Sequence, residues 1–234
     1  MMEGIFKNRI YPVTKRLFNT RKIVHFFRLN YYRLFKTGRT FFFDGRNYHY
    51  FYHGYNTAWR TERSVEIPIV WDFVQAYQGK NILEVGNVLS HYYPVTHTVL
   101  DKYETAPGVL NRDVVDYHPG LPYDLIVAIS TLEHVGWDEE PRDPPKVLRA
   151  IEHLKTCLAP GGRLIITIPM GQNVELDKYL RQHMIAFDRM LCMKRISKGN
   201  DWIETTWPEI QDAMYGSPFR AANGLVIGII DKPA

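Results

Sequence analysis

The sequence has little cysteine and no long hydrophobic run. Its two cysteines among 234 residues, Cys157 and Cys192, lie far apart without the spacing of metal ligands. A disulfide framework and a zinc site are therefore not expected, and a reducing compartment fits the composition. No apolar run approaches the roughly 20 residues that cross a bilayer. Basic residues interrupt the apolar positions near the start, so we expect no signal peptide. These absences predict a cytoplasmic protein.

Acidic residues are almost missing from the first 40 positions. This segment holds ten basic residues and one acid, Glu3, which gives it a net charge of +9. The whole chain carries +4, so the remainder carries −5. The basic character therefore belongs to an N-terminal arm and not to the body.

Within this arm, residues 23–35 have the spacing of an amphipathic helix. Ile23, Phe26, Phe27, Tyr31 and Leu34 recur at helical intervals. Two interpretations stay open. The helix could lie on an anionic membrane surface or grip a protein partner, which would place the protein at the inner face of a membrane. It could instead pack on the domain or on a second copy, with its charges solvated. No nucleic-acid-binding motif accompanies the charge, which argues against nucleic acid as a partner.

Residues 39–59 are rich in aromatic side chains, and the sequence DGRN at 44–47 predicts a hairpin turn between two short strands. We divide the chain accordingly. Residues 1–60 form a basic, aromatic-rich extension, and residues 61–234 form the main domain.

The domain alternates the patterns of helices and strands. Helices are expected over residues 66–77, over a segment that Asp143 caps at its N-terminus, and over residues 174–183. The crossover after the first strand is so short that its helix must be short too. Residues 201–219 form an insertion before the last strand. Strands are expected at 82–85, 97–100, 113–115, 123–129, 163–168, 191–196 and 225–230. This alternation predicts an α/β fold with a mostly parallel sheet.

Four segments of the domain, taken in order, resemble class I S-adenosylmethionine-dependent methyltransferases. They are ILEVG at 82–86, VLD at 99–101, YDLIV at 123–127 running on to LEHV at 132–135, and LAPGGRLII at 158–166. The resemblance covers most of the chain, roughly residues 66–230. It implies a Rossmann-like sheet of seven strands, mostly parallel, with the last strand antiparallel. It also implies S-adenosylmethionine as cofactor and S-adenosylhomocysteine as its product.

The resemblance assigns roles to polar residues at the carboxyl ends of the strands, where ligands bind in open α/β sheets. Gly86 lets the backbone approach the cofactor without a Cβ in the way. Glu84 is expected to hold the methionine amino group, and Asp101 the ribose hydroxyls. Asp113 and Val114 are expected to contact adenine, and Ser130 to pass beneath the methionine end. The cofactor-binding set is therefore Glu84, Gly86, Asn87, Asp101, Lys102, Asp113, Val114 and Ser130. For Glu84, an alternative is a strand-terminal acid that caps local backbone amides.

One departure from the family pattern concerns the glycine loop. The pattern acid-x-Gly-x-Gly-x-Gly is represented here by residues 84–90, with Val88 and Ser90 at the later glycine positions. Valine narrows the space for a cofactor. An inactive methyltransferase-like binding or scaffold protein is therefore the alternative to an active enzyme.

Glu133 and His134 are the predicted catalytic residues, because they lie just beyond the fourth strand. A hydroxyl acceptor must lose its proton as it attacks a methyl group, and histidine is the usual base near neutral pH. The alternative is that the pair caps the following helix. We predict O-methylation of a small molecule, a sugar, or a glycolipid or polysaccharide precursor. Some relatives that methylate catechols hold a divalent metal in this region, but nothing in this sequence assigns metal ligands.

Overall fold

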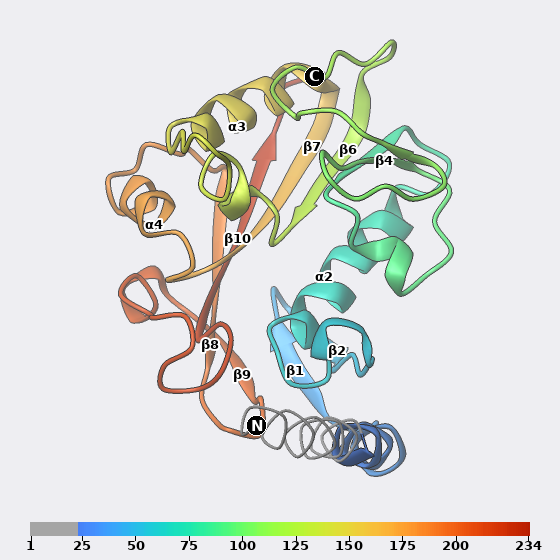
Figure 1. Ribbon diagram of the computed structural model, residues 1–234, viewed down its shortest axis with the longest axis vertical. Helices are drawn as coiled ribbons and strands as arrows, with labels where there is room; N and C mark the ends of the chain where they lie inside the picture. The colour runs from blue at the N-terminus through green and yellow to red at the C-terminus, as the bar shows by residue number, and fades with distance from the viewer. Residues whose placement is uncertain (1–22) are drawn as a thin grey trace, which may run out of the picture.

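The computed structural model describes residues 23–234 (Figure 1). Its body is an eight-stranded sheet in the order β5-β4-β3-β6-β7-β10-β8-β9. The strands are β3 (Ile82–Val85), β4 (Thr98–Leu100), β5 (Val109–Leu110), β6 (Tyr123–Ile129), β7 (Leu158–Pro169), β8 (Arg189–Arg195), β9 (Trp202–Thr205) and β10 (Gly224–Asp231).

The sheet confirms the predicted Rossmann-like α/β fold. The five strands from β5 to β7 pair in parallel, and β10 runs antiparallel to both β7 and β8. The eighth strand, β9, was not predicted. It arises within the insertion at 201–219 and pairs antiparallel with β8.

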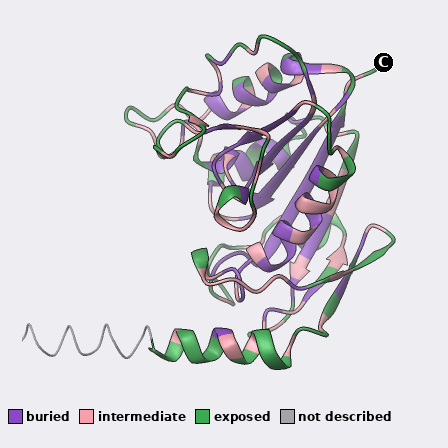
Figure 2. Ribbon diagram, turned by 90° about the vertical axis from the view of Figure 1, so that its right-hand side faces the viewer, coloured by how far each residue is buried: buried purple, intermediate pink, exposed green. Residues whose placement is uncertain are grey.

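Helices cover both faces of the sheet. The N-terminal helix is described over residues 23–35, and the others are α2 (Arg63–Ala76), α3 (Lys146–Cys157) and α4 (Val174–Arg181). One buried cluster joins α3 and α4 to alternate side chains of the strands, and a second cluster joins α2 to the opposite face. The central strands are buried on both faces, as Figure 2 shows. Such strands read as continuous apolar runs in the sequence.

The predicted hairpin is present as β1 (Thr40–Phe43) and β2 (Arg46–His49). Asp44 and Gly45 both have positive φ, the requirement of a tight two-residue hairpin turn. The hairpin packs against α2 and β9 and shares their buried cluster. The tyrosine hydroxyl of Tyr50 also accepts a hydrogen bond from the Trp202 amide at 2.8 Å. Phe41, Phe43 and Tyr50 thus belong to the core of the body, while the division at residue 60 stays a prediction.

Two local predictions are wrong. No strand forms at 113–115, because the Asp113 carboxylate turns the chain by accepting from the Val115 amide at 3.3 Å. The edge strand lies earlier, at β5. Likewise, the Asp143 side chain does not cap α3. It pairs with Arg149, while the Asp143 carbonyl accepts from the Lys146 amide at 2.9 Å.

The short crossover is confirmed, since a single 3₁₀ turn (Leu89–His91) fills it. Between residues 23 and 234, no helix combines the length and the apolar character needed to cross a membrane. The first 22 residues of the predicted basic arm lie outside the described residues.

The hairpin provides a test of whether the extension belongs to the core. Phe43 is 1% exposed and its neighbour Phe42 is 52% exposed, because adjacent strand residues face opposite sides. Phe43→Ala should lower the free energy of unfolding by about 3–5 kcal/mol, whereas Phe42→Ala should change it by less than about 0.5 kcal/mol. Urea denaturation measures both. Equal effects would mean that the hairpin is not packed into the body as described.

Candidate functional site

A cavity of about 690 Å³ opens at the carboxyl ends of β3, β4 and β6. The loops that follow these strands form its walls, where ligands of open α/β sheets bind. Seven of the eight predicted cofactor-binding residues line it, Glu84 being the exception. The lining also includes Tyr55, Asn56, Tyr103, Glu104, Arg112, Thr131, His134, Val135, Asp138 and Glu139.

Gly86 forms the tight turn that leaves β3. Its φ is +85°, a conformation that side chains disfavour. A Cβ at this position would lie 2.3 Å from Oγ1 of Thr131. The Gly86 amide donates to the Leu100 carbonyl at 2.8 Å, which ties the turn to the end of β4. Glycine is therefore required here both by the backbone conformation and by the space.

Glu84 lies beneath the loop and not in the cavity wall. It is fully buried, and its Oε1 accepts from the amides of Val88 and Leu89 at 2.8 and 2.7 Å. Its Oε2 lies 2.8 Å from Nε2 of His97. These are the contacts of the alternative interpretation, an acid that caps backbone amides. Binding of the methionine amino group by Glu84 stays a prediction.

Asp101 shapes the loop after β4. Its Oδ1 accepts from the amides of Tyr103 and Glu104 at 2.8 and 2.7 Å, and its Oδ2 accepts from the Asn87 amide at 3.1 Å. The Asn87 side chain donates to Oε1 of Glu104 at 2.8 Å. Glu104, an acid on the cavity wall close to both of these residues, was not predicted from the sequence. No strand-end motif marks it.

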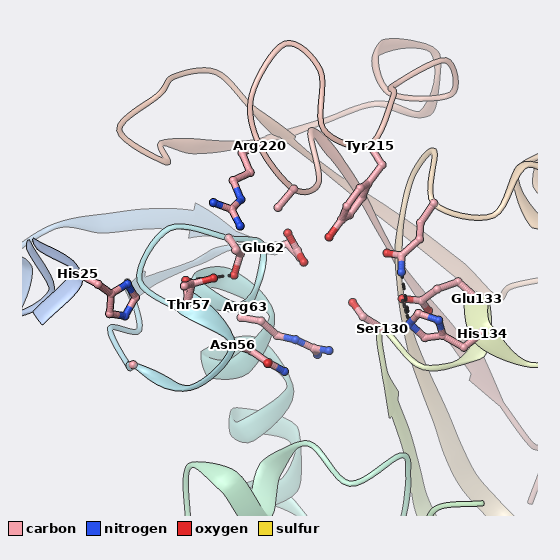
Figure 3. Close-up of a pocket in the computed structure, with 14 residues that line it drawn as sticks. His25, Asn56, Thr57, Glu62, Arg63, Ser130, Glu133, His134, Tyr215 and Arg220 are labelled. Atoms are coloured by element: carbon pink, nitrogen blue, oxygen red, sulfur yellow. Dashed lines mark hydrogen bonds and ion pairs between the residues drawn. The ribbon is translucent and has the colours of Figure 1, made fainter. Parts of the chain in front are cut away.

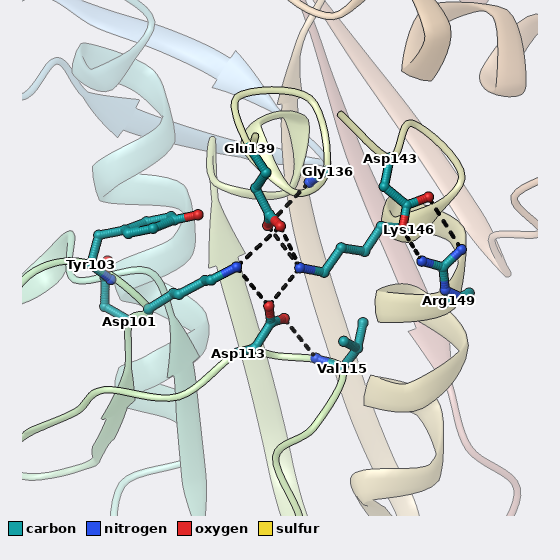
Figure 4. Close-up of polar contacts among 10 residues, drawn as sticks. Asp101, Tyr103, Asp113, Val115, Gly136, Glu139, Asp143, Lys146 and Arg149 are labelled. Atoms are coloured by element: carbon teal, nitrogen blue, oxygen red, sulfur yellow. Dashed lines mark hydrogen bonds and ion pairs between the residues drawn. The ribbon is translucent and has the colours of Figure 1, made fainter. Parts of the chain in front are cut away.

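Two lysines and two acids form a cluster of alternating charge beside this cavity (Figure 4). Nζ of Lys102 lies 2.8 Å from Asp113 and 3.0 Å from Glu139, while Nζ of Lys146 lies 2.5 and 2.6 Å from the same two acids. Burial opposes ionisation, but the hydrogen bonds from both lysines hold the pKa values of Asp113 and Glu139 below their usual range. The hydrogen bond to Asp113 likewise raises the pKa of Lys102.

This cluster explains where two predicted residues lie. Asp113 and Lys102 are at the cavity wall, but each is held by partners that the sequence did not reveal, namely Lys146 and Glu139. Val114, which follows Asp113, is buried against the same cavity. The cluster fixes the shape of the end at which the adenine contact was predicted.

A second cavity, of about 900 Å³, adjoins the first (Figure 3). The two share Asn56, Ser130 and His134 as lining residues. Most residues that line the second cavity have polar or charged side chains, although more of the exposed lining surface is apolar than polar; they include Thr57, Thr61, Glu62, Arg63, Glu133, Gln172, Tyr215 and Arg220. Two adjoining cavities with a shared wall suit a reaction between two bound molecules.

Ser130 ends β6 in an unusual backbone conformation, with φ of +39°. Its amide donates to Oγ1 of Thr167 at 3.0 Å, and its hydroxyl donates to Oε1 of Glu66. These bonds hold the turn between the two cavities. A non-glycine residue with positive φ persists only where its surroundings enforce it.

The first turn of α2 places the titratable side chains of Arg63 and Glu66 beside Ser130. Nη1 of Arg63 donates to the Ile129 carbonyl at 3.0 Å and lies 3.5 Å from Oε2 of Glu66. Burial would lower the pKa of Arg63, but the acids Glu66 and Glu62 outweigh it and raise that pKa. Burial raises the pKa of Glu66 in spite of the arginine. Neither Arg63 nor Glu62 was predicted from the sequence, and Glu66 was expected only as the start of a helix.

His134 lies on the shared wall, and its catalytic role stays a prediction. Its Nδ1 is 2.5 Å from Oδ2 of Asp138, four residues further along the chain. On the other side of the ring, Nε2 lies 3.3 Å from the side-chain nitrogen of Gln172. Asp138 and Gln172 therefore orient the imidazole from opposite sides. Asp138 was missed, since no motif marks it.

Glu133 is only 1% exposed and points toward the second cavity. Neither of its carboxyl oxygens has a hydrogen-bond partner in the described part of the chain, and Oε1 lies 3.8 Å from Nε2 of His134. Burial raises the pKa of Glu133 well above its usual value. Within residues 23–234, no group of three or more His, Cys, Asp or Glu side chains is placed to hold a metal ion.

A substitution at the β3 turn tests its role in forming the first cavity. Gly86→Ala adds a methyl group that collides with Thr131 and should weaken binding of S-adenosylhomocysteine at least about tenfold, the equivalent of 1.4 kcal/mol. Gly79→Ala is the matched control, because Gly79 also has positive φ, +82°, but has open space around it. Isothermal titration measures both affinities. Equal affinities would show that the turn does not form the ligand site.

The raised pKa of Glu133 predicts a pH-dependent stability. Because the folded state holds this proton more tightly than the unfolded state, the wild type should lose stability as pH rises from the unfolded pKa of about 4.3 toward the folded pKa. Glu133→Gln removes that titration, so the variant should gain stability relative to the wild type across this range. Thermal melting at several pH values measures it. A constant difference would contradict the neutral, buried acid.

The comparisons with known proteins agree with this arrangement. A family model described as a methyltransferase domain matches residues 71–202, more than half of the chain. Among curated proteins, none matches this sequence significantly.

Solved structures resemble the chain only distantly. One is the N-methyltransferase NodS from Bradyrhizobium japonicum in complex with S-adenosylhomocysteine, at 14% identity and a TM-score of 0.45, covering 74% of this chain and 88% of that one. Another is a possible histamine N-methyltransferase from Thermotoga maritima, at 16% identity and a TM-score of 0.40, covering 73% and 97%. The assignment therefore rests on the family match: this chain belongs to the class I S-adenosylmethionine-dependent methyltransferase family.

Proposed function

We propose that this methyltransferase acts on a hydroxyl oxygen of a small molecule, a sugar, or a glycolipid or polysaccharide precursor. The observation that carries the proposal is the position of His134. It lies on the wall shared by the two cavities, with Nδ1 held by Asp138. A base at that position suits an acceptor that must lose a proton.

The first cavity has the features that an S-adenosylmethionine site needs. The cradle at Gly86, which a Cβ would fill, lets a ligand approach the backbone closely. Asn87 and Glu104 offer polar atoms for a ribose, and Asp113 and Val114 lie where adenine contacts were expected. Ser130 and Thr131 are at the end nearest the second cavity. When bound, the cofactor supplies an electrophilic methyl group.

The second cavity suits an acceptor rich in hydroxyl groups. Threonine, serine, asparagine, glutamine and tyrosine side chains line it together with charged residues. Burial raises the pKa of Glu133 well above its usual value and so favours the protonated form, whose carboxyl group can donate a hydrogen bond to an acceptor oxygen. These polar side chains can bind the hydroxyl groups of a sugar, and the apolar part of the lining surface can contact its ring.

His134 would take the proton of the acceptor hydroxyl on Nε2. Asp138 accepts from the Nδ1–H group, which leaves Nε2 unprotonated, so that an acceptor hydroxyl that displaces the Gln172 contact can give its proton to this nitrogen. The donor contact from Gln172 to Nε2 agrees with this tautomer. As Nε2 takes the proton, the ring becomes an imidazolium and the Asp138 carboxylate stabilises its charge, the role that an acid has beside other catalytic histidines.

The inactive scaffold finds no support in the family match. Val88 and Ser90 are accommodated by a loop that Glu84 anchors through the Val88 and Leu89 amides. The loss of the later glycines is therefore compatible with an open cavity, about 690 Å³ in volume.

The proposal is tested by methyl transfer to a panel of methyl glycosides and simple phenols, followed as release of S-adenosylhomocysteine. On the acceptor so found, His134→Ala should lower turnover about 10²–10⁴-fold, the usual contribution of a general base. Asp138→Asn should lower it by about tenfold and shift the pH profile, since the imidazolium loses its partner.

His118→Ala is the matched control, because His118 is exposed and lies outside both cavities. Cofactor affinity is titrated in parallel, so that loss of binding is separated from loss of turnover. Transfer to amines with none to hydroxyls, or full turnover by His134→Ala, would refute the proposal.

A further inference from the structure

The helix at residues 23–35 has two different faces. Its inner face packs on the body through Leu29, which is buried, and through Tyr32, whose ring lies 5.0 Å from that of Trp59. Nε of Arg33 adds a hydrogen bond to the Tyr52 carbonyl at 3.1 Å. These contacts fix the rotation of the helix about its axis, so the outward direction of its other face is determined.

The outer face is apolar and exposed. It carries five large side chains at helical spacing, each at least half exposed: Phe26, Phe27, Tyr31, Leu34 and Phe35. Leu34 and Phe35 reach 72% and 71% exposure. Figure 2 shows this helix projecting from the body, exposed along most of its length. Five large apolar side chains exposed together on one helix face mark an interaction site.

The sides of this helix and the adjoining loops carry cations without acidic partners. Arg28, Arg60 and Arg220 take part in no ion pair within residues 23–234. They come from the helix and two separate loops, yet they lie close enough to influence one another. Burial, and then the charges of Arg220 and Arg28, lower the pKa of Arg60. Such a group of like charges favours an anionic surface.

We propose that the outer face of this helix inserts into the interface of an anionic lipid bilayer. The helix has an apolar face flanked by arginines, and it lies within the first 40 residues of the chain, which carry a net charge of +9. This is the pattern of an interfacial helix. The apolar side chains enter the acyl boundary, and the arginines contact the lipid phosphates. A second copy of the chain is the less suitable occupant, because it would bring the same positive charges together.

The docking would place the second cavity beside the bilayer. His25 belongs to the same helix and lines that cavity, while its ring lies 5.6 Å from that of Trp59. Among the proposed acceptors, docking favours a glycolipid, whose lipid part stays in the membrane. This last step alone rests on the proposed function, whereas docking needs neither cofactor nor acceptor.

Vesicle flotation of the full chain tests the docking. The wild type should float with vesicles of phosphatidylcholine and phosphatidylglycerol, and less as salt increases. Phe27→Ser/Leu34→Ser should lower the partition at least about tenfold, because each side chain contributes over 1 kcal/mol when buried. The control Leu121→Ser/Met184→Ser removes exposed apolar side chains elsewhere and should float like the wild type.

Several outcomes would overturn the inference. One is equal flotation of Phe27→Ser/Leu34→Ser and wild type, and another is no flotation at all. Equal flotation with phosphatidylcholine alone would remove the anionic requirement. A wild-type dimer in sedimentation that becomes a monomer in the Phe27→Ser/Leu34→Ser variant would assign the face to a second copy. The assay involves no methyl transfer, so its failure is distinct from failure of the proposed function.

Discussion

The buried carboxylate of Glu84 is the interaction on which the functional site depends. It has no contact with solvent, and its two oxygens bind the amides of the following loop and the ring of His97. A buried carboxylate is stable only when its acceptor capacity is used, so the loop must return to it. The turn at Gly86 and the short crossover follow from that requirement. The same contacts hold in place the loop that lacks the later glycines of the family pattern.

Beyond this loop, the site is held together by carboxylates that accept hydrogen bonds from loop amides or pair with lysines. Asp101 holds the amides of the second loop, and the cluster of Lys102, Asp113, Lys146 and Glu139 joins the third loop to α3. Since every acid in the cluster has a lysine beside it, the walls of the first cavity are already ordered. The second cavity differs, because neither carboxyl oxygen of Glu133, which lines it, has a hydrogen-bond partner among the described residues. Its polar groups are available to a ligand.

Much of the fold could be predicted from the sequence, because the central strands are short apolar runs bounded by turn residues. The hairpin followed from its Asp-Gly turn, and the position of His134 followed from the end of β6. The prediction failed where side-chain partners decide the backbone: Asp113 bends the chain through its own carboxylate, and Asp143 is engaged by Arg149. Asp138 and Glu104 could not be found, because their roles arise from distances between loops. The arginine and acids at the start of α2 look like ordinary helix residues until the fold brings them to β6.

The close contact between Gly86 and Thr131 has a consequence for how such sequences can diverge. The space that a side chain at position 86 would need is occupied by the side chain at position 131, on a different loop. The two positions therefore cannot vary independently: besides the strain of a positive φ, a larger residue at position 86 would require a smaller one at position 131. Since both border the first cavity, any such exchange would also reshape the surface that a ligand meets. The pair links the turn after β3 to the wall between the two cavities. A substitution in one of these loops therefore affects which residues the other loop can hold.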